Sequence, residues 1–147
     1  LVWIGMLMER RPQLVPTQPG VLSALEQIDT LNDLAWEVRR QDSSRSLGTA
    51  EEALALATSL EYEAGIAYAL LAKAFAQFRL AKLQEARSSA EKAKRYFKTL
   101  DDQQGLLRTY NTLGIVYGES GELLGALRAF LEADVLCKKL HDKGGEA

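Results

Sequence analysis

Chemically similar residues recur in this sequence at intervals of 40 positions. Glycine and leucine give series of three members: Gly65, Gly105 and Gly145, and Leu60, Leu100 and Leu140. Matching pairs at the same interval are Leu83 and Leu123, Ala86 and Ala126, Ala93 and Ala133, and Asp102 and Asp142. A period of roughly 20–50 residues is typical of chains built from stacked copies of one small unit, each burying its apolar face against its neighbours. The sequence therefore predicts a repeat architecture.

The repeating unit is expected to be helical. All three prolines, Pro12, Pro16 and Pro19, precede residue 20, so the strongest helix breaker is absent from everything after Gly20. Beyond that point apolar residues recur every three or four positions, which is the period of an amphipathic helix. The pattern predicts an all-α fold, with one helix from residue 21 to a break at 41–44 and further helices over 45–60, 63–80, 83–100, 104–119 and 123–140.

These helices pair into three antiparallel hairpins, over residues 22–60, 63–100 and 104–140. The predicted helical domain covers residues 21–147, and residues 143–147 are expected to start a further unit. Residues 1–20 are expected to form an extended or poorly ordered leader. Its first eight residues are apolar, so three alternatives stand: docking on its own domain, docking on a neighbouring molecule, or a cloning remnant.

The third hairpin carries a recognisable motif. Tyr110, Leu113, Gly114 and Tyr117 are followed by Ala126 and Phe130. The small residues allow two helices to cross closely, and the aromatic residues fill the space around the crossing. This pattern resembles the tetratricopeptide (TPR) repeat, and the longer period resembles the 40-residue TPR variant of bacterial sensory proteins. The resemblance covers residues 22–147, and it implies a right-handed α-solenoid, a TPR-like superhelix.

The other two hairpins depart from the motif. The second has Lys73, Ala74, Gln77 and Ala90 at the Leu, Gly, Tyr and Phe positions, and the first has Val38 at the Tyr position. The first unit's "LNDLAWEV" and the joint "LDDQQG" are the stretches most similar to the bacterial sensory group.

In such a fold the first helix of each hairpin lines a concave groove. The family's groove positions fall here on Asn32, Trp36, Arg39, Arg40, Tyr68, Leu71, Phe75, Phe78, Arg79, Arg108, Asn111, Ile115 and Glu119. Asn32 and Asn111 share one family position, at which an amide can hold a ligand backbone. The arginines suit bidentate contact with carboxylates. The resemblance thus implies a protein or peptide partner with acidic groups and an apolar anchor. In the alternative reading, the aromatic residues only pack between hairpins and the arginines are solvated.

Composition excludes several function classes. The net charge is −2 and the isoelectric point about 5.5, which does not suit a general nucleic-acid surface. A basic strip on the fourth helix (Arg87, Lys92, Lys94, Arg95 and Lys98) is expected to face solvent. No apolar run approaches the ~20 residues that span a bilayer. A single cysteine is compatible with the cytoplasm, the expected location.

No catalytic constellation, metal site or cofactor site is predicted. The chain has one histidine, one cysteine and no Walker-type loop. His141 lacks companion metal ligands, and Cys137 is expected to be a buried structural thiol because it lies between apolar neighbours.

The sequence therefore predicts a non-enzymatic interaction module, as the regulatory part of a larger bacterial signalling protein. The alternative is a structural self-association unit that dimerises through the leader or the C-terminal face. The sixth helix carries Leu127, Leu131, Val135 and Leu136 beside its hairpin contacts. Such an apolar end predicts further repeats, another domain or self-association.

Overall fold

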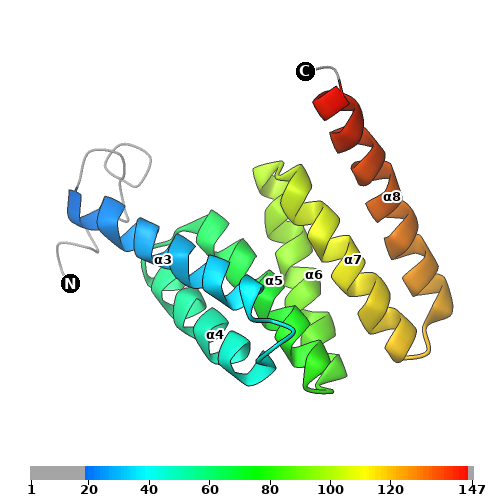
Figure 1. Cartoon of the computed structure of the whole chain (residues 1–147), viewed down its shortest axis with the longest axis horizontal. Coiled ribbons are helices and arrows are strands. Elements are labelled where there is room, and N and C mark those ends of the chain that lie inside the picture. Colours follow the sequence, from blue (N-terminus) through cyan, green and yellow to red (C-terminus); the bar gives the residue numbers. More distant parts are fainter. Residues whose placement is uncertain (1–18, 146–147) are drawn as a thin grey trace.

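A computed structural model describes residues 19–145 of the 147-residue chain. Those residues form six α-helices joined by short turns, with no strand among them (Figure 1). The helices are α3 (Pro19–Glu37), α4 (Ser43–Ser59), α5 (Glu63–Arg79), α6 (Leu83–Leu100), α7 (Gln103–Glu119) and α8 (Leu123–Gly145). The predicted all-α fold is confirmed for this part of the chain. The leader lies outside the described residues, apart from Pro19 and Gly20, which begin α3.

The helix starts lie within two residues of the predicted ones, because the signals that set them are local. Asp42 precedes α4, and its carboxylate accepts a hydrogen bond from the backbone N–H of Arg45 at 3.0 Å. Asp102 precedes α7 and accepts from the N–H of Gly105 at 2.9 Å. Each cap satisfies a backbone donor that the helix leaves open, and it stabilises the helix by about 1 kcal/mol.

The helix ends show a regularity that the sequence pattern does not reveal. One residue just after each of α4, α5, α6 and α7 has a left-handed backbone: Glu61 (φ 52°), Ala81 (φ 64°), Asp101 (φ 53°) and Gly121 (φ 80°). These residues are 20 positions apart, so the four turns from α4 to α8 use the same conformation, whereas the turn between α3 and α4 has no left-handed residue. A left-handed residue redirects the chain at a helix end, and only Gly121 adopts it without the steric cost of a Cβ atom.

Consecutive helices pack against one another, and α5 also contacts α3 and α7. The first helices of the three pairs are therefore neighbours, with α5 in the middle (Figure 1). Because four helices surround α5, most of its residues are buried, many of them alanines. Small side chains allow this close approach, and alanines on the two flanking helices are buried too: Ala50, Ala53 and Ala57 of α4, and Ala86, Ala90 and Ala93 of α6.

The last helix, α8, is covered on one side only. Ala126, Ala129, Ala133 and Leu136 face α7 and are buried, at the three- and four-residue spacing of one helix face. The opposite face is exposed and mostly apolar, with Leu123, Leu124, Leu127, Leu131 and Val135. It also carries the exposed ion pair between Asp134 and Lys138, whose Oδ2 and Nζ lie 3.0 Å apart. Grouping Leu136 with the open side was wrong.

The prediction of a buried Cys137 was also wrong, because its side chain is exposed. Cys137 lies seven residues, or about two helical turns, after Phe130, which is 42% exposed. Phe130, two turns earlier on the same side of the helix, is itself partly in solvent. Apolar neighbours in the sequence are therefore not enough to bury Cys137.

The helix α8 continues to Gly145, five residues beyond the predicted end at Leu140. Residues 143–145 therefore belong to the last turn of α8, and the start of a further unit over residues 143–147 stays a prediction. In α6 the chain leaves the helix at Asp101, where α7 packs back and Asp102 caps the next helix. No described segment packs back in this way on the end of α8. Within residues 19–145, no helix is long and apolar enough to cross a membrane.

Candidate functional site

A row of aromatic side chains crosses α3 and α5. The rings of Trp36 and Phe75 meet edge to face, with centroids 6.0 Å apart, and Phe75 meets Phe78 at the same separation. Phe75 is buried, whereas Trp36 and Phe78 are half-buried. Such pairs contribute roughly 0.5–1.5 kcal/mol beyond the area they bury. The row therefore joins the first two hairpins and also leaves ring surface accessible.

Three guanidinium groups gather around this row. Arg39 Cζ lies 3.8 Å from the centre of the Trp36 ring and 5.1 Å from that of Phe75. Arg40 Cζ lies 5.7 Å from the Phe75 ring, and Arg108 Cζ from α7 lies 5.2 Å from the Trp36 ring. A cation within about 6 Å of an aromatic face is attracted by the negative face of the ring. The aromatic row thus brings together positive charges from the α3–α4 turn and from α7.

Arg39 is the most constrained of the three. Its Nη1 donates to the Trp36 carbonyl at 2.7 Å, and its buried Nε has no hydrogen-bond partner among the described residues. Burial lowers the pKa of Arg39, and the charges of Arg40 and Arg108 lower it further. Arginine stays ionised at neutral pH, so this cluster holds like charges whose repulsion an anion would relieve.

These residues line a hollow of about 520 Å³, which we call the arginine hollow. Its walls are Trp36, Arg39, Arg40, Phe75, Gln104, Leu107, Arg108, Asn111, Thr112, Ile115 and Phe130. No aspartate or glutamate is among them. The hollow therefore combines positive charge, an aromatic wall and apolar side chains.

A second hollow of about 330 Å³ shares Trp36 and Arg108 with the first, and we call it the aspartate hollow. Its walls are Asp29, Asn32, Asp33, Trp36, Tyr62, Ala64, Tyr68, Leu71 and Arg108. Carboxylate oxygens and aromatic rings dominate this lining, so its electrostatic character is opposite to that of the arginine hollow.

Asn32 and Asn111, which the TPR resemblance aligned, have different surroundings. Asn32 is 6% exposed, and its Nδ2 donates to the Gly65 carbonyl at 3.1 Å, which ties α3 to α5. Its Oδ1 is buried without a hydrogen-bond partner among the described residues. Asn111 is exposed on α7. One N–H of the Asn32 amide is therefore used within the chain, and its carbonyl oxygen is an acceptor that no described residue satisfies.

Two tyrosines of the aspartate hollow donate to carboxylates. Tyr62 donates to Asp29 Oδ1 at 2.8 Å, and Tyr68 of α5 donates to Asp102 Oδ2 at 2.5 Å. Burial raises the pKa of Tyr62 to about 12, and the bond to Asp29 adds to the shift. Burial and the bond to Asp102 raise the pKa of Tyr68 as well. Both hydroxyls therefore remain neutral donors at neutral pH, and they fix the walls of the hollow.

Three of the predicted groove residues do not line either hollow. Phe78 packs on Phe75, while Arg79 and Glu119 are exposed at the last positions of α5 and α7, beyond the hollows. The other predicted groove residues line one hollow or both.

Sequence reasoning missed the remaining lining residues, of which Asp29 and Asp33 are the most consequential. Their spacing from Asn32 and Trp36 is that of one helix face, and this signal was available in the sequence.

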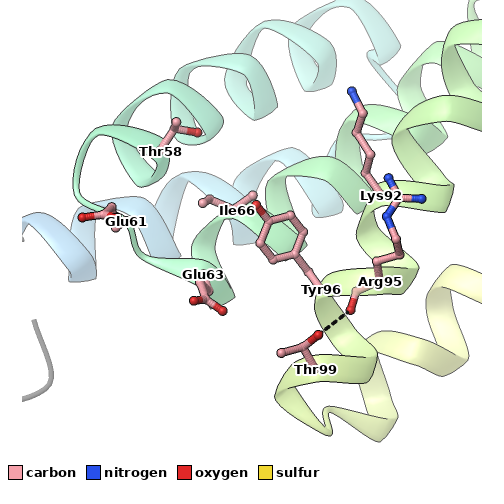
Figure 2. A pocket seen from close by; sticks show the side chains of 8 residues that line it. All are labelled: Thr58, Glu61, Glu63, Ile66, Lys92, Arg95, Tyr96 and Thr99. Carbon is pink, nitrogen blue, oxygen red and sulfur yellow. Dashed lines mark hydrogen bonds between the residues drawn. The ribbon is translucent and has the colours of Figure 1, made fainter.

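A third hollow, of about 740 Å³, lies between α4, α5 and α6, and Figure 2 shows its lining. Lys92 and Arg95 reach it from α6, Glu61 and Glu63 come from the α4–α5 turn and the start of α5, and Tyr96 lies between them. Both signs of charge are thus present in this outer hollow. It offers less preference for one charge than either of the two smaller hollows.

Two other residues of the basic strip on α6, Arg87 and Lys94, contact carboxylates. Arg87 Nη1 lies 2.6 Å from Glu122 Oε2, and Lys94 Nζ lies 3.2 Å from Glu91 Oε2. The whole strip was expected to face solvent. Lys92, Arg95 and Lys98 are exposed, but Arg87 and Lys94 are half-buried.

No group of three or more histidine, cysteine, aspartate or glutamate residues that could hold a metal ion occurs among the described residues. Comparison with protein-family models, with curated proteins and with solved structures found no match to this chain.

Proposed function

We propose that this chain is a non-enzymatic interaction module that binds a segment of a partner protein along α3, α5 and α7. In this proposal the three helical pairs form a TPR-like α-solenoid, and the two small hollows belong to its concave groove. The observation that carries the proposal is the convergence of Arg39, Arg40 and Arg108 on the Trp36–Phe75 wall, in a hollow with no acidic lining residue.

The chemistry of the arginine hollow indicates what the segment contains. Guanidinium groups bind carboxylates through charge-assisted hydrogen bonds that contribute about 1.5–3 kcal/mol each. Trp36, Leu107 and Ile115 supply apolar wall for an anchor side chain beside them. The preferred ligand is therefore a peptide with an acidic group next to an apolar side chain. A regulatory role in a larger bacterial signalling protein is part of the proposal, and it rests on the TPR resemblance.

The test uses an array of short synthetic peptides, each with one Leu or Phe at varied distances from a pair of Glu residues. The tightest binder is then measured by fluorescence anisotropy against the wild type and against Arg40→Ala/Arg108→Ala. We expect the affinity of the double variant to fall at least about tenfold, since two charged contacts are removed. Arg39 is left intact because it also binds the Trp36 carbonyl.

Arg79→Ala is the matched control, because Arg79 is an exposed arginine at the end of α5 that lines neither hollow. Its affinity should change less than about twofold if the contacts are local. The control removes one charge and the double variant removes two. If the free-energy loss in the control were half that in the double variant or more, only overall charge would matter and the groove proposal would fail. Absence of any binder in the array would count against it as well.

A second candidate function, self-association with another copy of this chain, is favoured by the exposed face of α8. Leu127 and Leu131 lie 40 positions after Arg87 and Glu91 of α6. Those two α6 residues contact the next hairpin, Arg87 through Glu122 and Glu91 through the Tyr117 hydroxyl. The apolar face of α8 thus corresponds to the side of α6 on which a neighbouring hairpin packs. In this candidate function, a second copy of the chain takes that place.

The variant Leu127→Arg/Leu131→Glu gives α8 the residue types of α6 at these positions. We expect sedimentation velocity over a range of concentrations to show that the wild type associates and that the variant stays monomeric. The variant should be as stable as the wild type. A second variant that lacks residues 1–18 measures the contribution of the leader. A wild-type chain that stays monomeric at every concentration would exclude self-association.

A further inference from the structure

The aspartate hollow contains an acceptor that no described group satisfies. Asn32 lines the hollow with 6% of its surface exposed, and its Oδ1 has no hydrogen-bond partner among the described residues. Because Nδ2 is directed at the Gly65 carbonyl at 3.1 Å, the amide cannot be flipped without bringing two oxygens together. A buried acceptor without a donor costs about 1–3 kcal/mol, so a ligand N–H at this point would be stabilising.

The same hollow carries negative charge. Asp29 and Asp33 line it from α3, one turn apart and on either side of Asn32 in the sequence. Burial raises the pKa of Asp29, and the nearby carboxylates of Asp33 and Glu26 raise it further, although the Tyr62 hydroxyl donates to it. The carboxylates therefore repel one another, and a bound cation would lower that repulsion.

Three rings, Trp36, Tyr62 and Tyr68, complete the walls. Aromatic faces attract cations. Arg108 is the one basic residue of the lining, and it stands at the boundary with the arginine hollow, whose wall it also forms. Oxygen acceptors, carboxylates and rings together select a positively charged donor.

We infer that the aspartate hollow binds a protonated primary amine of the partner segment, with one N–H directed at Asn32 Oδ1 and its charge facing Asp29 and Asp33. The amine is either the α-ammonium group of a chain N-terminus or a lysine ammonium group, because both present the same NH₃⁺ donor set. The oxygen of Asn32 is nearly closed to solvent, which favours a small ammonium over a methylated or planar cation. This inference rests on the proposed function, and it adds a cationic subsite beside the anionic one.

The primary test uses ethylammonium as the probe, so that it does not depend on any peptide. The full chain, labelled with ¹⁵N, is titrated at constant ionic strength while the side-chain NH₂ of Asn32 and the amide of Gly65 are followed by NMR. We expect saturable shifts at these two groups. Tetramethylammonium, which has the same charge and no N–H, should leave the Asn32 signals unshifted. No shift with ethylammonium, or equal shifts with both ions, would overturn the inference.

Charge variants locate the site. In Asp29→Asn/Asp33→Asn the two carboxylates become neutral amides of similar shape, and the affinity for ethylammonium should fall at least about fivefold because the charge-assisted contacts are lost. The control Glu37→Gln/Glu52→Gln removes two exposed carboxylates from α3 and α4, outside the hollow. An equal loss in the control would contradict a local site.

Peptide variants then separate the two sources of the amine. Acetylating the N-terminus of the best array peptide should lower its affinity if the α-amine binds. Replacing a lysine by norleucine should lower the affinity if a lysine binds. A peptide that binds through the arginines and ignores both changes would refute the amine subsite but leave the proposed function intact. If ethylammonium bound but no peptide did, the amine subsite would be supported and the proposed function would be refuted.

Discussion

Asn32 of α3 and Asn111 of α7 occupy corresponding positions, yet Asn32 is buried and bonded to Gly65 while Asn111 is exposed. The phenylalanines show the same contrast. Phe97 of α6 packs on Gly105 and is 0% exposed, and Phe130 of α8 packs on Gly114 and is 42% exposed. The difference follows from what comes next in the chain. The following hairpin packs on α3 through α5 and on α6 through α7, whereas no described helix after α8 packs on α7 or α8. The same contact between a phenylalanine ring and a glycine is thus buried between α6 and α7 but partly exposed between α8 and α7.

The largest difference is expected between Phe97→Ala and Phe130→Ala. Removing the Phe97 ring leaves a cavity between α6 and α7. It also deletes the edge contact with Tyr68, whose ring centroid lies 4.8 Å away, so the free energy of unfolding should fall by about 3–5 kcal/mol. Phe130 is partly in water already, and its removal should cost less than about 1.5 kcal/mol. Urea unfolding followed by circular dichroism measures both values. Equal losses would show that α8 is covered in solution.

The glycines beneath these rings should differ in the same direction. A Cβ atom at Gly105 would collide with the Phe97 ring, which has no room to move, and Gly105→Ala should destabilise by about 1–3 kcal/mol. The Cβ of Gly114→Ala meets the Phe130 ring, which can rotate into solvent, so the cost should stay below about 1 kcal/mol.

Gly48→Ala is the baseline for both glycine variants. Gly48 is exposed within α4 and its added Cβ would meet no atom within 4 Å. Alanine there should stabilise the protein by about 0.5–1 kcal/mol through helix propensity alone. If Gly114→Ala were as damaging as Gly105→Ala relative to this baseline, Phe130 would have to be held in place by a covering partner.

The tyrosine–carboxylate hydrogen bonds at the first and last hairpin junctions should contribute equally to stability. Burial and a bonded carboxylate raise the pKa of Tyr62 to about 12 at the first junction, and burial and Glu91 raise that of Tyr117 to about 12 at the last. The tyrosine pKa in an unfolded chain is about 10. Between pH ~10 and ~12 the unfolded chain loses these protons while the folded chain keeps them, so the free energy of unfolding falls as pH rises.

Tyr62→Phe and Tyr117→Phe should each make this fall shallower, by similar amounts, in unfolding experiments over that pH range. The double variant should combine the two effects, since the residues belong to different junctions. A change in Tyr62→Phe alone would mean that the bond between Tyr117 and Glu91 is absent in solution.

The smallest effect on stability is expected at Cys137. Its side chain is exposed on α8, so Cys137→Ser should change the free energy of unfolding by less than about 0.5 kcal/mol. A thiol reagent such as iodoacetamide should modify Cys137 in the folded protein nearly as fast as in the unfolded one. Strong protection in the folded state would indicate a covered α8.

Local signals determined the helices from the sequence alone. The starts of α4 and α7 follow Asp42 and Asp102, whose carboxylates cap backbone donors three residues ahead, and a cap needs no distant partner. The spacing of apolar residues likewise predicted which helices exist. The TPR resemblance predicted Trp36 and Arg108 as groove residues, and both line the two hollows. Asp29 and Asp33 were missed, although they lie on the same helix face as Trp36.

Only the tertiary structure decided how each of these residues is used. The sequence by itself determined an all-α chain with a 40-residue period, because helix propensity, capping and apolar spacing act over a few residues. It did not show that Asn32 is buried, that Cys137 is exposed or that α8 continues to Gly145. Each of these depends on whether another helix packs against the site, and burial is decided by contacts between residues far apart in the chain.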